Sequence, residues 1–221
     1  MVHFRNIPLV AKINFRMIVM ALVIGLVAVS CKKDDQGNII LPEDFFMFGV
    51  KSGKVVYEFT NSDYETQTLI FDDYGKRMRL ERAEYDVVIF DAIAEKAYEM
   101  SMSDKTYNVI PYSNTYATAA VAGFIYLGDD VGSVWQYYSG FKKESNQTIA
   151  GKNCTVYSWS ADGEKVTWGG WKRLTFLYKT TYNAQDYDYG HKAISFTESI
   201  PANSFAPPAD YTNESDNKIL N

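Results

Sequence analysis

Histidine and carboxylate side chains, which carry acid–base and metal chemistry, come together in the stretch "QDYDYGH", which contains Asp186, Asp188 and His191. A calcium loop starting at Asp186 would need glycine at its sixth position and a bidentate glutamate at its twelfth. His191 and Thr197 occupy these two positions. Aspartate and glycine are common in turns. We therefore interpret the stretch as an acidic hairpin turn and predict no metal site.

Other catalytic signatures are also missing from the sequence. His191 is the only histidine after residue 30, so a histidine-rich or cysteine-rich zinc site cannot be assembled. The sequence has neither a G-x-S-x-G nucleophile motif nor a phosphate-binding P-loop. Paired carboxylates such as Asp72–Asp73 are neighbours in turns, with no second group predicted to face them. We expect a protein that is not an enzyme and that carries no cofactor.

Cys31 stands where an uncharged apolar run ends. The run "MIVMALVIGLVAVSC" follows Arg5, Lys12 and Arg16, and no acidic residue precedes Asp34. A basic leader, a short apolar core and small residues are typical of a secretory signal peptide. The alternative is an uncleaved anchor, but the run is shorter than the roughly 20 apolar residues that cross a bilayer comfortably. We predict a signal peptide over residues 1–30.

The residues around Cys31 resemble a bacterial lipobox, in which a cysteine after small residues receives diacylglycerol and becomes the new N-terminus. Ala28 stands where leucine is commoner. Acyl chains on Cys31 would anchor the protein to a membrane. The following Lys32, Lys33, Asp34 and Asp35 resemble the Lys/Asp-rich export signal of Bacteroidetes surface lipoproteins, or they form a solvated tether. We predict an acylated tether over residues 31–47.

The charge and the cysteine content of residues 31–221 argue against nucleic-acid binding and against an intramolecular disulfide. Residues 1–30 remove three of the 22 basic side chains and none of the 27 acidic ones, leaving 19 basic against 27 acidic groups. An acidic chain without a basic stripe is not expected to bind nucleic acid. Cys154 has no partner for a disulfide if Cys31 is acylated, and it lies in a strand-like run. We predict that Cys154 is a buried, unreactive core residue.

Alternation of apolar and polar residues dominates the chain from Ser52 onward. Val55, Tyr57 and Phe59 alternate with polar residues, and the pattern recurs in later runs. A period of two residues is typical of half-buried strands, and Asp/Gly turns between the runs favour antiparallel hairpins. We predict a meandering sheet with strands near 54–60, 66–72, 76–83, 85–92, 95–102, 105–110, 142–150, 153–160, 164–168, 171–179 and 190–199.

The middle of the chain departs from this alternation. Val131, Val134, Trp135 and Tyr138 have the spacing of one helix face, with Asp130 as a cap and Gly140 as a terminator. We predict an amphipathic helix there. The preceding segment 114–127 is apolar and rich in small residues, which fits a helix, a lid or a strand. The segment "PANSFAPPADY" before the C-terminus is typical of a covering loop.

The order of these runs resembles a known family. "IAGKNC" at residues 149–154 and "FAPP" at residues 205–208 lie where Bacteroidetes lipoproteins of unknown function have similar structural motifs. The domain of these proteins looks like the lipoprotein-localisation-factor (LolA/LolB-like) half-barrel, and the resemblance covers about residues 48–212. It implies an α+β fold dominated by one strongly curved antiparallel meander, closed by a short helix and loops. It also implies an apolar cavity that relatives use for acyl chains, with no functional residue carried over.

The aromatic residues allow three interpretations. The sequence has 17 Tyr, 13 Phe and 4 Trp. They could fill the core, line a ligand cavity as Trp168, Trp171, Phe176 and Tyr178 would on late strands, or stack on sugars at the surface. If the sheet curls, we expect the alternating sets to face one common interior. The candidate ligand-binding residues are then Tyr57, Phe59, Met78, Leu80, Tyr98, Met100, Trp135 and Tyr138.

The sequence thus predicts an exported lipoprotein anchored through Cys31 at the bacterial outer membrane. We expect a half-barrel over 48–212 and a loose tail over 213–221. The predicted function is binding or carriage of an apolar, lipid-like ligand. The alternative is a non-catalytic interaction or glycan-binding accessory lipoprotein. The sequence does not identify a protein partner.

Overall fold

The computed structural model describes residues 32–33, 39–40, 47–61, 65–82, 86–128, 140–161, 163–182 and 187–215. Cys31, Asp34, Asp35, Trp135 and Tyr138 lie outside the described residues, as does most of the helix predicted over 130–140. Within the predicted tether, the short strands β1 (Lys32–Lys33) and β2 (Ile39–Ile40) pair antiparallel, with Lys33 opposite Ile39. No helix in the described ranges is long and apolar enough to span a membrane.

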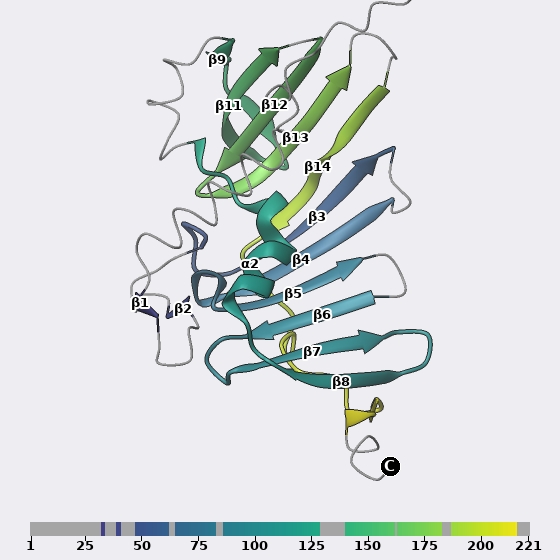
Figure 1. The fold of residues 1–221 in the computed structure, drawn as a ribbon. Helices are drawn as coiled ribbons and strands as arrows, with labels where there is room; N and C mark the ends of the chain where they lie inside the picture. Colours follow the sequence, from purple (N-terminus) through teal and green to yellow (C-terminus); the bar gives the residue numbers. More distant parts are fainter. Residues whose placement is uncertain are drawn as a thin grey trace, which may run out of the picture.

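Thirteen strands of the described chain form one large sheet (Figure 1). All neighbours pair antiparallel except β15, which runs parallel to β8. Along the sheet the strands follow the order β10 (Gln147–Ile149), β11 (Lys152–Ala161), β12 (Glu164–Trp171), β13 (Leu174–Tyr182), β14 (Tyr187–Thr197), β3 (Gly53–Thr60), β4 (Thr66–Asp72), β5 (Arg77–Arg82), β6 (Asp86–Asp91), β7 (Lys96–Ser101), β8 (Thr106–Pro111) and β15 (Thr212–Asn213), while β9 (Phe141–Lys143) pairs with β11.

The predicted strands are confirmed with one notable exception. In β5, Met78 and Leu80 are buried, while Arg79 faces the other way and forms an ion pair with Glu81 over 2.7 Å. Alternation therefore does place one apolar face against the core. The strand predicted over 142–150 is instead split into β9 and β10, because the chain leaves the ladder at residues 144–146 and both pieces pair with β11.

The sheet consists of two meanders joined by one long-range pairing. Strands β3 to β8 follow one another, and so do β11 to β14. The two series meet where β14 pairs with β3, with Ala193 opposite Tyr57. The register of β14 shifts between Ala193 and Ser195, and such an irregularity increases local twist. The sheet is therefore more than the simple meander predicted from hairpin spacing.

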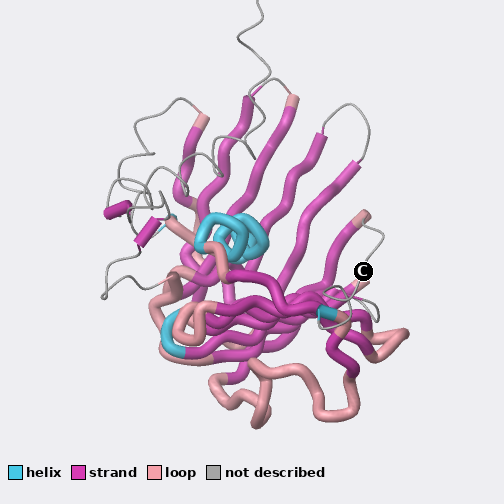
Figure 2. Tube along the Cα trace, turned by 60° about the horizontal axis from the view of Figure 1, so that its bottom comes forward, coloured by secondary structure: helices cyan, strands magenta, loops and turns pink. Residues whose placement is uncertain are grey.

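A short helix covers the concave side of the curled, unclosed sheet (Figure 2). The undecided segment 114–127 contains α2 (Asn114–Val121), followed by the 3-10 turn η2 (Ala122–Phe124). Ser113 begins the helix, because its hydroxyl oxygen accepts the Tyr116 backbone N–H. This arrangement confirms the predicted α+β half-barrel closed by a short helix.

Two apolar clusters lie on opposite faces of the sheet. The larger, which we call the main core, includes Tyr57, Met78, Leu80 and Phe90 from the strands and Ala117 and Phe124 from the α2–η2 region. The smaller, which we call the outer cluster, contains the buried residues Val87, Ile89 and Met100, with Tyr98, Tyr107, Phe205 and Tyr211 packed against them. The main core occupies the concave side.

The outer cluster corrects the expectation of one common interior. In β7, Ala97 lies opposite Phe90 and belongs to the main core, whereas Tyr98 lies opposite Ile89 on the other face. Met100 shares the face of Tyr98, so neither residue faces the interior that contains Tyr57 and Leu80. Alternation fixes which residues share a face but leaves open which face becomes concave.

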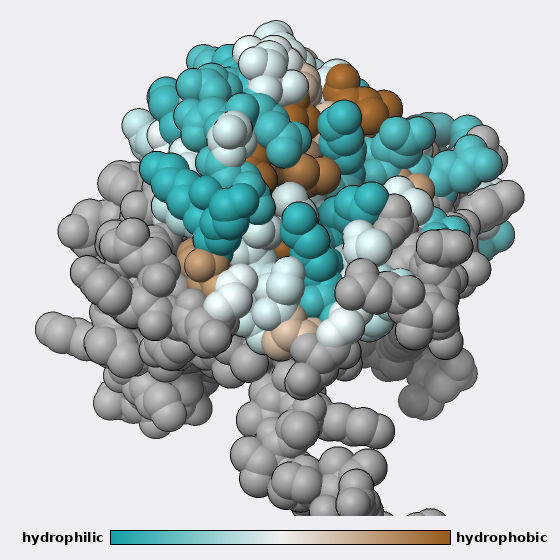
Figure 3. All heavy atoms as spheres, turned by 90° about the horizontal axis from the view of Figure 1, so that it is seen from above, coloured by the Kyte–Doolittle hydropathy of each residue, from teal (hydrophilic) through white to brown (hydrophobic). Residues whose placement is uncertain are grey.

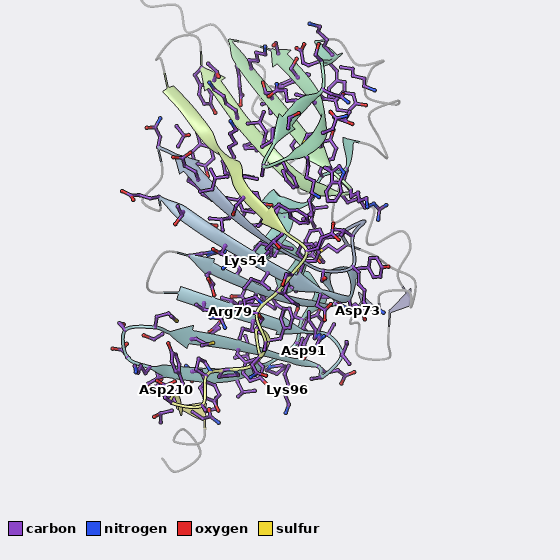
Figure 4. The ribbon with its side chains drawn as sticks, turned by 180° about the vertical axis from the view of Figure 1, so that it is seen from behind. Lys54, Asp73, Arg79, Asp91, Lys96 and Asp210 are labelled. Atoms are coloured by element: carbon purple, nitrogen blue, oxygen red, sulfur yellow. The ribbon has the colours of Figure 1, made fainter. Side chains whose placement is uncertain are left out.

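The segment after β14 covers the outer cluster, as predicted for a covering loop. Figure 4 shows it crossing the back of the sheet past Arg79 to Asp210. Arg79 donates to the Ser204 carbonyl over 3.5 Å, and the Arg77 guanidinium lies 5.0 Å from the centre of the Phe205 ring. The segment ends in β15 against β8, where the Glu214 N–H donates to the Tyr107 carbonyl over 2.9 Å. Residues 213–215, at the start of the predicted tail, are thus held by β8.

Candidate functional site

Five rings gather on the concave side, and four of them surround His191, the only histidine after residue 30. We call them the inner aromatic cluster: Tyr57, Phe59, Phe124, Tyr178 and His191. The imidazole centroid lies 5.1 Å from Phe59, 5.3 Å from Tyr57, 5.4 Å from Phe124 and 5.8 Å from Tyr178. Tyr57 and Phe124 also contact each other at 4.6 Å. These are the spacings of favourable ring–ring contacts.

The register of three neighbouring strands assembles this cluster. His191 of β14 lies opposite Phe59 of β3 on one side and Tyr178 of β13 on the other. Directly opposite residues of antiparallel strands share a face. The fifth ring comes from η2, which passes over the imidazole: a Cβ built on Gly123 would lie 3.8 Å from His191 Cε1. The cluster therefore lies between the sheet and the short helical segment.

Hydrogen bonds to the sheet satisfy the polar ends of the neighbouring aromatic residues. The Tyr57 hydroxyl donates to the Thr175 carbonyl over 2.9 Å, and the Tyr126 hydroxyl donates to the Thr155 carbonyl over 2.7 Å. Trp168 Nε1 donates to Thr175 Oγ1 over 3.3 Å. Burial raises the pKa of Tyr57 far above its ordinary value, with the Cys154 thiolate charge as a smaller cause. These rings therefore present neutral, apolar faces.

The aromatic surface extends beyond the inner aromatic cluster and becomes partly accessible. Tyr126 and Trp168 lie 4.9 Å apart, and Phe141 of β9 stacks on Tyr157 at 5.3 Å. Tyr57 is fully buried, whereas Phe59 and Tyr178 are half-buried. The half-buried rings of Phe59 and Tyr178 suit an apolar chain better than a charged substrate. On the end of the molecule seen from above, some apolar side chains lie between hydrophilic ones (Figure 3).

The structure brings together half of the predicted ligand-binding set. Tyr57, Met78 and Leu80 belong to the main core, and Phe59 packs against it. Tyr98 and Met100 lie on the outer face, and Trp135 and Tyr138 are outside the described residues. The further candidates Trp168, Trp171, Phe176 and Tyr178 all lie in the main core or pack against it.

Sequence reasoning misses two members of the inner aromatic cluster. The sequence analysis interprets the stretch that contains His191 as an acidic hairpin turn, but Tyr187–His191 belong to strand β14. Alternation with the buried Ala193 places His191 at an inward-facing position of that strand. Phe124 lies in the segment whose structure the sequence leaves open, and no pattern there indicates that it caps the sheet.

Metal and thiol chemistry gain no support from the geometry. Within the described ranges, His, Cys, Asp and Glu nowhere form a group of three that could hold a metal ion. Cys154 is fully buried in the main core, as predicted, and its Sγ lies 3.6 Å from the Lys152 carbonyl oxygen.

Comparisons with known proteins identify no family. No family model matches the chain, and no curated protein matches it. Three solved structures have 6–10% identity and TM-scores of 0.43–0.45. An uncharacterized conserved protein from Thermus thermophilus matches 74% of this chain and 89% of its own, with 6% identity and a TM-score of 0.43.

The other two structures contain MucB. MucB in complex with MucA(peri) matches 73% of this chain at 10% identity, with a TM-score of 0.45. The MucA/MucB complex of Pseudomonas aeruginosa also matches 73% at 10% identity, with a TM-score of 0.44. This chain covers 56–57% of those MucB chains. Similarity at this level assigns neither a family nor a function to the chain.

Proposed function

We propose that this chain is an exported, non-catalytic lipoprotein, acylated at Cys31, whose half-barrel binds an apolar, lipid-like ligand. The observation that carries the proposal is the inner aromatic cluster, where half-buried Phe59 and Tyr178 border a buried histidine on a concave, unclosed sheet. Acyl chains gain free energy from contact with such rings through removal of apolar surface from water.

The proposal includes the finer assignments drawn from the sequence. These are membership of the Bacteroidetes lipoproteins with a LolA/LolB-like half-barrel, and attachment to the outer membrane through the anchor. The anchor distinguishes this protein from a soluble carrier, since several acyl chains hold a protein stably on a membrane. A tethered half-barrel would take up or present its ligand beside one membrane.

Native mass spectrometry of protein extracted from cells tests ligand binding. We expect a non-covalent lipid mass in addition to the covalent mass on Cys31. Phe59→Ala should lower the fraction of lipid-bound protein several-fold, because it removes a half-buried ring of the concave side. Tyr98→Ala is the matched control, since Tyr98 is also half-buried but lies on the outer face. Absence of bound lipid, or equal loss in both variants, would favour the interaction or glycan-binding alternative.

Metabolic labelling with a fatty-acid analogue tests the anchor separately. Cys31→Ser should abolish the label and leave an unprocessed precursor, because position 31 then has no thiol to receive diacylglycerol. Cys154→Ser is the control and should leave labelling unchanged, since Cys154 is buried in the main core. Labelling that persists in Cys31→Ser would disprove the lipoprotein assignment.

A further inference from the structure

Two left-handed turns hold the segment through which the tether enters the sheet. In the first turn Asp73, Tyr74 and Gly75 have φ values of 48°, 60° and 99°. The Met47 and Phe48 N–H groups donate to the Tyr74 carbonyl over 3.0 and 3.1 Å, and the Tyr74 N–H donates to the Lys51 carbonyl over 2.9 Å. The tether therefore joins the domain at a fixed place.

The second turn joins β12 to β13 and consists of Lys172 and Arg173. Their φ values are 47° and 62°, and the Gly49 N–H donates to the Lys172 carbonyl over 2.8 Å. Two-residue hairpin turns with two positive φ values strongly prefer Asn-Gly. Lys172 and Arg173 occupy these positions here, although positive φ values strain residues that have a Cβ atom. Backbone strain of this kind is found at functional sites, where the side chains have a role.

At the end of the sheet that carries these two turns, Lys152 and Lys172 flank the Trp171 ring. Lys172 Nζ lies 4.8 Å from the Trp171 ring centroid and Lys152 Nζ lies 4.5 Å from it. Lys152 Nζ also lies 5.0 Å from the Phe196 ring and 3.9 Å from a carboxylate oxygen of Glu198. Lys51 and Lys172 are exposed, and Trp171 is half-buried. Tryptophan beside lysine is a common composition at membrane–water interfaces.

We propose that this end, the basic rim of Lys51, Lys152, Trp171 and Lys172, contacts the anionic headgroups of the membrane that holds the Cys31 acyl chains. The inference rests on the proposed anchor. The chain after residue 30 has more acidic than basic side chains, so an anionic surface would repel most of it. A local basic group attracts such a surface within about one Debye length, roughly 8 Å at physiological salt.

The position of the tether favours this orientation. The tether enters at residues 47–51, between the Asp73–Gly75 turn and the Lys172–Arg173 turn, and its strand β1 pairs with β2. At the opposite end of the sheet, exposed Glu58 and Glu65 lie beside the β3–β4 connection, and exposed Lys165 lies on β12. The predicted tether therefore joins the domain at the same end as the basic rim.

Amine labelling of the acylated, full-length mature protein on vesicles tests the proposal. The protein is inserted from outside into vesicles of phosphatidylcholine alone or with one third phosphatidylglycerol, and labelled with a membrane-impermeant N-hydroxysuccinimide ester. Mass spectrometry should show at least threefold slower labelling of Lys51, Lys152 and Lys172 on the anionic vesicles. Lys165, exposed opposite Ser160 near the far end of β11, and Lys143, exposed opposite Tyr157 in the middle of β11, should label equally on both. High salt should remove the protection, because it screens the headgroups.

A variant pair checks that charge is responsible. Lys51→Glu/Lys172→Glu should remove the protection of Lys152, whereas Lys143→Glu/Lys165→Glu should leave it unchanged. The salt experiment uses the unmodified chain and so remains informative if the first variant fails to fold. Equal labelling of acylated protein on both vesicles would overturn this inference alone. Absence of the covalent diacylglycerol mass would instead overturn the proposed anchor.

Discussion

The two faces of the sheet are both apolar but are closed in different ways. On the concave face, the rings of neighbouring strands contact one another and a helical segment from the middle of the chain. On the outer face, three buried residues depend on a segment that follows the last long strand. The concave face is therefore covered by a centrally placed element, and the outer face by the C-terminal region.

This difference teaches that equal alternation does not imply equal packing. On β6, Phe90 and Ile89 are adjacent and both fully buried, yet they belong to different clusters. Phe90 contacts the Tyr116 ring of α2 at 5.4 Å. Ile89 belongs to the cluster against which Phe205 and Tyr211 of the C-terminal segment pack. Beside Phe205 the segment is linked to the sheet by a hydrogen bond of 3.5 Å, and it is held more closely only further along, where β15 pairs with β8. We expect the outer site to adjust more easily to lost volume.

Alanine at Phe90 or Ile89 should give the largest losses of stability. Phe90→Ala should lower the free energy of unfolding by about 3–5 kcal/mol, and Ile89→Ala by about 2 kcal/mol, at the low end for such truncations, because the covering segment can move into the space. Urea unfolding of both variants measures the difference. An equal or larger loss for Ile89→Ala would show that the outer face is packed as rigidly as the concave one.

Cys154 tests the main core chemically. Cys154→Ser should cost about 1–3 kcal/mol, because a hydroxyl would replace a thiol in an apolar site. A thiol reagent should modify Cys154 far more slowly in the native protein than in denaturant, since the side chain is fully buried. Equal rates would contradict the strand assignment around it.

Alkaline pH should lower the free energy of unfolding through Tyr112, which packs against the main core. Burial, with the nearby Asp91 charge as a smaller cause, raises the pKa of Tyr112 to about 12. An unfolded tyrosine loses its proton near pH 10, so the folded state is favoured fully below pH 10 and loses this stability as the pH rises toward 12. Each such group contributes about 1.4 kcal/mol per pH unit in that window. Unfolding titrations of the wild type and Tyr112→Phe measure this; a Tyr112→Phe variant with the same pH dependence would contradict it.

The smallest change in stability is expected at the Lys105–Asp210 ion pair, which lies at the β8 edge of the sheet. Lys105 and Asp210 form an ion pair at 2.9 Å, but both side chains are 62% exposed. Asp210→Asn should leave stability unchanged within error, because water screens exposed pairs. Thermal unfolding at low and high salt measures it. A clear loss at low salt would show that the C-terminal segment depends on this pair.

Period-two alternation predicted most of the strands because it depends on local backbone geometry. Burial of Cys154 also followed from its place in such a run, and the covering role of the segment before the C-terminus followed from its composition. These features need only neighbouring residues. The same local reasoning assigned Tyr57, Met78 and Leu80 to one interior, where they lie.

Features that depend on distant residues could not be predicted in this way. Tyr98 and Met100 have the alternation of inward-facing residues, but small Ala97 is the one that faces the main core. The pairing of β14 with β3 places His191 beside Phe59, and no local pattern contains this register. The Lys172–Arg173 turn departs from turn preferences, so its residues do not indicate its backbone conformation.

The pairing of β14 with β3 also has a consequence for how the chain folds. The two meanders can join only after residues 190–197 have been synthesised, because these residues pair with residues 54–60. Contacts at such sequence separation slow folding, because a long loop must be closed before they form. Until synthesis reaches β14, the central strand β3 lacks one neighbour. The two meanders therefore stay unjoined until most of the chain has been made.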